Sequence, residues 1–214
     1  YAPEGQTPVI WEKLTRDHLS VMGGMTPLGK IYTLARQESL NGLHSIEFLI
    51  VLNSSTGELI WRQGISENVV SSPAVKDGVL YVSSNDRKIR AFNASTGEEI
   101  WKFNTDDDIS SSPAVKEGIV FVGSNDDKVY ALNSTTGALI WSFATADDVM
   151  SSPALSDGKV VSGSNDGKVY VLNSTTGALI WSYSTGSPVV SSPAIAKDKV
   201  FIGSNNGILY AFGP

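Results

Sequence analysis

Aspartates are the residues of this sequence whose side chains are best suited to chemistry such as metal binding. Asp106, Asp107 and Asp108 are adjacent, and carboxylate oxygens are the ligands that Ca²⁺ prefers in proteins. Consecutive side chains of an extended segment point in alternating directions, so three neighbouring carboxylates converge poorly on one ion. The sequence also lacks an Asp-x-Asp-x-Asp-Gly loop followed by a distal Glu, the pattern of calcium-binding loops. We therefore predict no metal site at these residues.

Histidine is the other residue type that could perform acid–base chemistry, and the sequence has two, His18 and His44. His44 lies near Glu38 and Glu47 in the chain, so an acid–base pair is conceivable there. No candidate nucleophile accompanies it. The chain has no cysteine, which excludes thiol nucleophiles, disulfides and thiolate metal ligands. We therefore expect no catalytic residue and no enzymatic activity.

The overall charge limits the classes of binding partner that we expect. The 214 residues carry a formal net charge of −6. No basic stripe is present to neutralise phosphates, so we expect no nucleic-acid partner. No run approaches the 18 or so apolar residues that a membrane-spanning helix requires, so we expect no transmembrane segment. Tyr1 in place of Met is typical of a processed chain, or of one whose targeting signal has been removed.

An internal repeat determines the elements that position these side chains. Tryptophan, proline and glycine each recur at an interval of 40 residues. The recurring residues are Trp61, Trp101, Trp141 and Trp181; Pro73, Pro113, Pro153 and Pro193; and Gly57, Gly97, Gly137 and Gly177. One supersecondary unit is therefore copied without insertion or deletion along most of the chain.

Each unit reads as four short β-strands. In one copy, residues 149–155, 159–164, 168–173 and 178–184 are extended and rich in β-formers, and turns separate them. Asn165-Asp166-Gly167 is a tight hairpin signal, because Asn and Gly tolerate positive φ. Helical periodicity is absent. Four antiparallel strands in about 40 residues are typical of a β-propeller blade, so we predict an all-β fold.

The unit occurs five times, and the last copy has only three strands. The expected blades are, in chain order, about 18–64, 69–104, 109–144, 149–184 and 189–214. Residues 8–13 resemble a fourth strand, because Trp11 stands where the complete blades have their tryptophan. We therefore predict that residues 1–214 form one domain: a monomeric five-bladed β-propeller, closed where the N-terminal strand completes the last blade. Closure would remove exposed sheet edges.

Blade 1 contains the one sizeable insertion, Arg36 to Glu47, in its second hairpin. It carries Leu40 and Leu43 among polar residues, beside His44. Because the other blades are nearly equal, a one-to-one partner needs such an asymmetric feature, and we expect the two leucines to anchor it. The alternative is a loop tip that merely tolerates extra residues.

The strongest resemblance lies in the third and fourth strands. Ala131-Leu132-Asn133-Ser134-Thr135-Thr136-Gly137-Ala138-Leu139-Ile140-Trp141 resembles the tryptophan-docking motif of the pyrroloquinoline-quinone (PQQ)-like propeller repeat family. The resemblance implies that each tryptophan stacks on the Thr-Gly peptide of an adjacent blade. It assigns this role to Trp11, Trp61, Trp101, Trp141 and Trp181, with Gly57, Gly97, Gly137 and Gly177 as acceptors. The family also contains outer-membrane assembly scaffold lipoproteins and extracytoplasmic domains of sensors, which implies an extracytoplasmic or secreted location.

The enzymes of that family are implied to be eight-bladed quinoprotein dehydrogenases. They hold PQQ with Ca²⁺, an adjacent cysteine pair, an aspartate base and a stacking tryptophan. This chain has five blades of sequence and no cysteine, and all five tryptophans occupy the docking position. We therefore predict that it binds neither PQQ nor Ca²⁺ and has no cofactor.

Acidic residues gather on one predicted face of the propeller. On this face the connections between blades lie beside the hairpins that join the second and third strands of each blade. The candidate partner-binding residues there are Asp106, Asp107, Asp108, Asp126, Asp127, Asp147 and Asp148. Such a field would attract a basic partner. The alternative is that acidic turns simply prevent aggregation of a β-rich protein.

The sequence supports two main hypotheses of function. The first is a non-enzymatic protein-binding or scaffold propeller. The alternative is a small-ligand or lectin-like module with one site per blade gap, and a degenerate dehydrogenase is a distant third.

Asn53, Asn93, Asn133 and Asn173 each begin an Asn-x-Ser/Thr sequon. We expect these asparagines to cap a turn, with glycosylation as the alternative.

Overall fold

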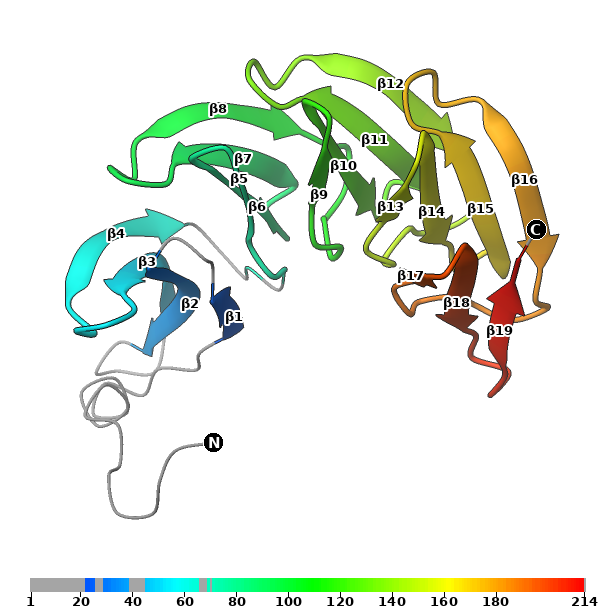
Figure 1. Cartoon of the computed structure of the whole chain (residues 1–214), viewed down its shortest axis with the longest axis horizontal. Helices are drawn as coiled ribbons and strands as arrows, with labels where there is room; N and C mark the ends of the chain where they lie inside the picture. Colours follow the sequence, from blue (N-terminus) through cyan, green and yellow to red (C-terminus); the bar gives the residue numbers. More distant parts are fainter. Residues whose placement is uncertain (1–21, 26–28, 39–44, 66–68, 70, 214) are drawn as a thin grey trace.

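Figure 1 shows the computed structural model of the chain, which describes residues 22–25, 29–38, 45–65, 69 and 71–213. Every element within these ranges is a β-strand, and none of the described residues forms a helix that could cross a bilayer. The strands form four four-stranded sheets and one three-stranded sheet, all antiparallel. The all-β class and the four-stranded antiparallel blades are confirmed.

The sheets follow the chain blade by blade. Blade 1 contains β1 (Met22–Met25), β2 (Lys30–Glu38), β3 (Ser45–Asn53) and β4 (Leu59–Ile65). Blade 2 contains β5 (Ala74–Lys76), β6 (Val79–Ser84), β7 (Lys88–Asn93) and β8 (Glu99–Asn104). Blade 3 contains β9 (Ala114–Lys116), β10 (Ile119–Ser124), β11 (Lys128–Asn133) and β12 (Leu139–Ala144). Blade 4 contains β13 (Ala154–Ser156), β14 (Lys159–Gly163), β15 (Lys168–Asn173) and β16 (Leu179–Ser184). Blade 5 contains β17 (Ala194–Ala196), β18 (Lys199–Gly203) and β19 (Leu209–Phe212).

The innermost strand of each blade is shorter than predicted. The first strand of blade 4 was predicted at residues 149–155, which include Ser151-Ser152-Pro153, but β5, β9, β13 and β17 begin only at the alanine after the proline. Proline has no N–H to give to the ladder, so pairing starts at the next residue. The first serine replaces the missing pairing: Ser111 Oγ donates to the Gly123 carbonyl at 2.8 Å and accepts from the Gly123 N–H at 2.8 Å.

The second serine of the same segment joins neighbouring blades. The Ser72 N–H donates to Ser112 Oγ at 2.9 Å, and the Ser112 N–H donates to Ser152 Oγ at 2.8 Å. The series continues from the Ser152 N–H to Ser192 Oγ at 3.1 Å. These contacts link the innermost segments of successive blades.

The fourth strand of each complete blade contains a β-bulge. Ala131 pairs with Trp141 and Leu132 pairs with Leu139, so Ile140 has no pairing partner on β11. The same shift occurs in blades 1, 2 and 4. The bulge turns the isoleucine outward, where it is 44% exposed, and leaves Trp141 facing the next blade.

The hydrophobic core lies between successive sheets rather than inside one of them. One cluster joins Tyr81 and Ile89 of blade 2 to Val120 and Tyr130 of blade 3, through the buried Ile109 of the connection. Equivalent clusters join blades 3 and 4 and blades 4 and 5. Each blade is therefore stabilised mainly by its contacts with neighbouring blades.

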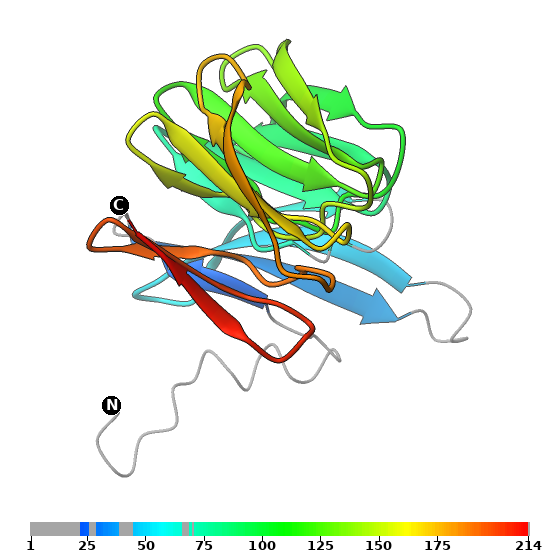
Figure 2. The same cartoon turned by 90° about the vertical axis from the view of Figure 1, so that its right-hand side faces the viewer.

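The described sheets form an arc. Figure 1 shows β1–β4 at one end and β17–β19 at the other, with a gap between them. Figure 2 views the arc from the end at which β17–β19 lie, with these strands in front. Residues 8–13 and Trp11, predicted to close the ring, lie outside the described residues. Closure of the ring stays a prediction.

The predicted insertion in blade 1 is partly strand. The β2–β3 ladder continues from Arg36 opposite Glu47 to Glu38 opposite Ser45. In blade 2 the equivalent ladder ends at Ser84 opposite Lys88. Residues 36–38 and 45–47 are therefore a longer hairpin stem, whereas Leu40, Leu43 and His44 lie outside the described residues.

Candidate functional site

The connection between two blades is held against the hairpin tips of both of them. In the connection 105–110, the Thr105 N–H donates to the Arg87 carbonyl of blade 2 at 2.9 Å. The Asp106 N–H donates to Asp126 Oδ2 of blade 3 at 2.9 Å. The Asp108 carbonyl accepts from the Asn125 N–H at 2.9 Å. The connection therefore brings Asp106, Asp107 and Asp108 beside the hairpin tips, as we predicted for one face.

The connection 145–150 repeats this geometry. The Thr145 N–H donates to the Asp127 carbonyl at 2.8 Å, and the Ala146 N–H donates to Asp166 Oδ2 at 3.1 Å. Val149 anchors it: the side chain is fully buried, and a Cβ on Gly123 would lie 2.4 Å from it. We call these two connections, together with the hairpin tips 85–87, 125–127 and 165–167, the acidic edge.

One predicted partner-binding residue, Asp126, is buried and hydrogen-bonded within the fold. The Asp126 side chain is only 4% exposed. Its Oδ2 accepts a hydrogen bond from the Tyr130 hydroxyl at 2.6 Å as well as from the Asp106 N–H. Burial and this hydrogen bond raise the pKa of Tyr130. Asp126 therefore positions the connection, and a partner cannot reach it without breaking that arrangement.

The other aspartates of the acidic edge face solvent to different degrees. Asp106 is 84% exposed at its side chain and lies 3.0 Å from Lys128 Nζ. That hydrogen bond raises the pKa of Lys128. Asp108 is half-buried and lies 3.9 Å from Arg87 Nε. Asp107 and Asp147 are exposed, which leaves their outward oxygens available to a partner.

A carboxylate cluster that the sequence reasoning missed lies at the junction of blades 3 and 4. Oxygens of Asp127, Asp147 and Asp148 lie within 4.8 Å of one another. Burial and the charges of Asp147, Asp127 and Asp107 raise the pKa of Asp148. At the junction of blades 2 and 3, Arg87 occupies the position of Asp127 and pairs with Asp108. The presence of Asp127 in blade 3 where blade 2 has Arg87 was the sequence signal of this cluster of negative charge.

Trp61, Trp101 and Trp141 each lie against a glycine in a turn of the next blade. A Cβ on Gly137 would lie 2.7 Å from the Trp101 ring, and Trp61 over Gly97 and Trp141 over Gly177 show the same contact. Trp101 Nε1 donates to the Ser134 carbonyl at 2.9 Å. Asn133 Oδ1 accepts from the Thr135 and Thr136 N–H groups at 3.0 Å, so this asparagine caps the turn as predicted.

Docked tryptophans do not suit quinone binding. The indoles of Trp61, Trp101 and Trp141 are each committed to a neighbouring blade, both by ring contact and by an N–H donor. Trp181 packs edge-on against Phe212 with ring centroids 4.8 Å apart. Three of the four described tryptophans are therefore committed to contacts between blades, whereas Trp181 is 38% exposed.

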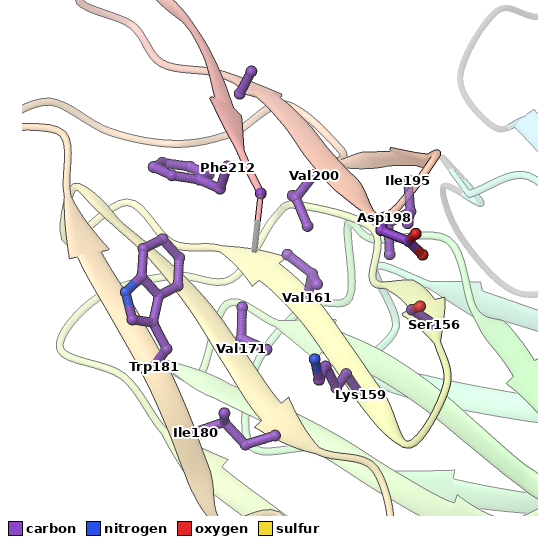
Figure 3. A pocket seen from close by; sticks show the side chains of 12 residues that line it. Ser156, Lys159, Val161, Val171, Ile180, Trp181, Ile195, Asp198, Val200 and Phe212 are labelled. Atoms are coloured by element: carbon purple, nitrogen blue, oxygen red, sulfur yellow. The ribbon is translucent and has the colours of Figure 1, made fainter.

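The gaps between blades are unequal. Between blades 4 and 5 lies a cavity of about 790 Å³, whose walls include Trp181, Val171, Val200 and Phe212 (Figure 3). The cavity between blades 3 and 4 measures about 10 Å³. The two gaps therefore differ in the space that they leave.

Comparisons with solved structures agree with this arrangement. The crystal structure of BamB from Moraxella catarrhalis matches 90% of this chain with a TM-score of 0.74 and 20% identity. The chain spans 58% of the length of that protein. The computationally designed Ika8 protein matches 91% of this chain and 71% of its own, with a TM-score of 0.73 and 15% identity. The designed Ika4 protein matches 71% of this chain and 94% of its own, with a TM-score of 0.65 and 21% identity.

Sequence comparison identifies the family. No curated protein matches the chain. The family model described as outer membrane protein assembly factor BamB matches residues 46–105 and 86–214. These segments include all the complete tryptophan-docking motifs and all the blades from the third strand of blade 1 onward. The chain therefore belongs to the PQQ-like repeat family of β-propellers that this BamB model describes.

Proposed function

We propose that this protein is a non-enzymatic β-propeller that acts as a protein-binding or scaffold module, in the extracytoplasmic part of a surface or sensor protein. Its family model is named for a factor that assembles outer membrane proteins, and family membership is the observation that carries the proposal. The docked tryptophans add support, because the residues most conspicuous in the repeat are committed to holding blades together.

The acidic edge is the surface that such a partner would use. Asp106, Asp107 and Asp147 are exposed there and are displayed by connections that buried residues anchor. A preorganised group of carboxylates favours a partner with a basic surface and increases its rate of encounter.

The extended hairpin of blade 1 would supply specificity. It belongs to the same set of second-to-third strand hairpins as the tips of the acidic edge, so the topology places it on the same face. Its stem is three residue pairs longer than that of blade 2. Leu40, Leu43 and His44 lie outside the described residues, between the two halves of this stem in the sequence, and would give a partner a contact that no other blade duplicates.

Matched charge variants test this proposal. Asp106→Asn, Asp107→Asn and Asp147→Asn combined should reduce capture of the partner from a native extract, read by cross-linking and mass spectrometry. The control neutralises three acids of the opposite turns, Asp77→Asn, Glu117→Gln and Asp157→Asn, and should leave capture intact. Equal capture by all three proteins would contradict the role of the acidic edge.

We propose further that the protein has no quinoprotein dehydrogenase activity and no cofactor. Calorimetric titration with PQQ in the presence of Ca²⁺ should give no stoichiometric heat. A saturable signal in the micromolar range would overturn this part of the proposal.

The last blade is proposed to be composite, with residues 8–13 as the fourth strand of the β17–β19 sheet. Each described tryptophan of the fourth strand precedes the first paired residue of the next blade by 13 residues, as Trp61 precedes Ala74. The register pairs Gly24 with Tyr32, as Ala74 pairs with Tyr81, and Trp11 precedes Gly24 by the same 13 residues. In a single chain this composite blade gives the closed five-bladed ring.

A further inference from the structure

The turn between the third and fourth strands of each complete blade contains an Asn-x-Ser/Thr sequon, and its geometry is the same in all four copies. Asn133 Oδ1 accepts from the backbone N–H groups two and three residues later, at 3.0 Å. Asn53, Asn93 and Asn173 accept from the equivalent groups at 2.8–3.1 Å. The Asn133 N–H also donates to the Ala138 carbonyl at 2.8 Å, which closes the turn. The turn therefore uses the backbone of the asparagine and one oxygen of its side chain.

The amide nitrogen of each asparagine takes no part in that cap. Within the ranges that the structure describes, Nδ2 of Asn53, Asn93, Asn133 and Asn173 has no hydrogen-bond partner and is not buried. An aspartate would cap the turn through the same oxygen. The amide nitrogen is thus a solvent-accessible group for which the cap has no need.

The hydroxyl of the sequon is a second group that the fold leaves unused in three of the four copies. The hydroxyls of Ser55, Thr135 and Thr175 make no hydrogen bond in the described part of the chain, and all three residues are exposed. In blade 2, Ser95 Oγ accepts from Lys30 Nζ at 3.1 Å. A hydroxyl two residues after an asparagine is what distinguishes an acceptor of an N-linked glycan.

The other side of the same turn is closed by the preceding blade. Trp101 Nε1 donates to the Ser134 carbonyl at 2.9 Å, and Gly137 is buried against the Trp101 ring. The tryptophan therefore holds the inner side of the turn, while the amide nitrogen of Asn133 reaches solvent. A bulky group on that nitrogen needs no change in the contact between blades.

These turns lie at the opposite ends of the strands from the acidic edge, because consecutive antiparallel strands connect at alternate ends. A group attached there leaves the acidic edge free. The turns also lead into the fourth strands, which Figure 1 shows on the outer side of the arc. Leu139 and Ile140 at the start of β12 are 49% and 44% exposed, so a polar group beside them would limit association through this surface.

We propose that Asn53, Asn93, Asn133 and Asn173 are N-glycosylation sites. The inference rests on the extracytoplasmic location proposed above. Nδ2 of the asparagine forms a bond to the anomeric carbon of an oligosaccharide that is carried on a polyprenyl pyrophosphate. The bond from that carbon to the pyrophosphate oxygen breaks, and the amide nitrogen loses one proton. The product retains Oδ1 as an acceptor, so the cap of the turn remains.

Mass spectrometry of peptides from the protein purified from its native source tests the inference. Peptides that contain the sequon asparagines should carry sugar on Nδ2, and sugar at any of the four supports the inference at that site. Four unmodified asparagines overturn it. Fractionation of the same cells separates the two proposals: an unmodified protein in the extracytoplasmic fraction overturns glycosylation alone, whereas an unmodified cytoplasmic protein overturns the location as well.

Two exposed threonines of one turn provide matched variants for expression in the native host. Thr135→Val removes the hydroxyl of the Asn133 sequon but keeps the backbone N–H that donates to Asn133 Oδ1, so it should lose the mass of one glycan. Thr136→Val is the control, because Thr136 lies outside the sequon, and it should keep that mass. Asn133→Asp keeps a capping oxygen and should also lose one glycan. Loss of mass in both threonine variants, or in neither, would overturn recognition of the sequon.

Discussion

A glycine opposite each tryptophan limits what the repeat can contain at these positions. Gly137 has φ +71°, a conformation costly for other residues, and its α-carbon faces the Trp101 ring so closely that a Cβ would overlap it. Both requirements are visible in the Thr-Gly-x-x-x-Trp spacing, which is why the docking role could be predicted from the sequence. The partner of each tryptophan could be named for the same reason.

Gly137→Ala should destabilise the protein by about 3 kcal/mol or more, because it adds steric overlap to the cost of positive φ. Gly158→Ala is the control for conformation alone: its φ is +66° and a Cβ there would meet nothing within 4 Å. That variant should lose about 1 kcal/mol. Urea denaturation measures both. Equal losses would show that the tryptophan contact contributes little.

Charge at the junction of blades 3 and 4 could not be foreseen residue by residue. The sequence indicated an acidic face, but only the structure shows that Asp126 is buried as a hydrogen-bond acceptor while Asp148 lies among three other carboxylates. Asp126 belongs to a hairpin tip and Asp148 to a connection between blades. Burial of each side chain depends on the neighbouring blade, which a local pattern does not specify.

Asp148→Asn should stabilise the protein at pH 7 by about 0.5 kcal/mol after solvent screening. Its pKa is raised in the folded state, so its favourable contribution is complete below the unfolded pKa of about 3.9 and is lost as pH rises through the folded pKa. The difference between variant and unmodified protein should therefore vanish near pH 3. Thermal melts across pH 3–7 at low salt measure it. A variant no more stable than the unmodified protein at pH 7 would show that repulsion is negligible.

At the scale of elements, strand number was predictable and strand length was not. Turn residues and alternating apolar positions locate four strands per unit. The β2–β3 stem reaches Glu38 and Ser45 because backbone hydrogen bonds alone extend a ladder, without an apolar pattern in Arg36–Glu38. Conversely, Pro73 delays the start of β5, since tertiary contacts of Ser71 and Ser72 replace strand pairing.

Replacing Arg36–Glu47 with Asn-Asp-Gly should change the melting temperature by no more than about 3 °C, because blades 2 to 4 fold with a hairpin of that length. Capture of the partner should fall. A second variant that replaces only residues 39–44 with Asn-Gly keeps the longer stem and separates its contribution from that of Leu40, Leu43 and His44. Unchanged capture by both variants, with loss in the acidic-edge variant, would assign recognition to charge alone.

For the whole molecule, the repeat predicted how many sheets form but not how they curve. A small change in side-chain volume at each junction alters the rotation between sheets, and the effect accumulates along the array. Contacts such as Ile89 with Tyr130 therefore set the curvature, and their geometry cannot be inferred from spacing. Closure depends on this accumulated rotation, which explains why residue counting alone did not decide it.

Deletion of residues 1–13 should lower the melting temperature by roughly 5–10 °C, because it removes an edge strand and a docked tryptophan from the composite blade. Deletion of residues 1–5 retains the strand and should melt like the full chain. Differential scanning calorimetry measures both. If the longer deletion melts at the same temperature, residues 8–13 contribute no strand to the stable fold.

The serine and tryptophan contacts between blades have a consequence for how such a gene changes over time. One unit carries both the donor and the acceptor of each contact, as Ser112 accepts from Ser72 and donates to Ser152. A duplication or loss of one whole unit therefore leaves every remaining junction complementary. Residues 133–142 and 173–182 are identical in sequence, and such stretches are where unequal recombination begins. Array length in these proteins can thus vary in whole units without the evolution of any new interface.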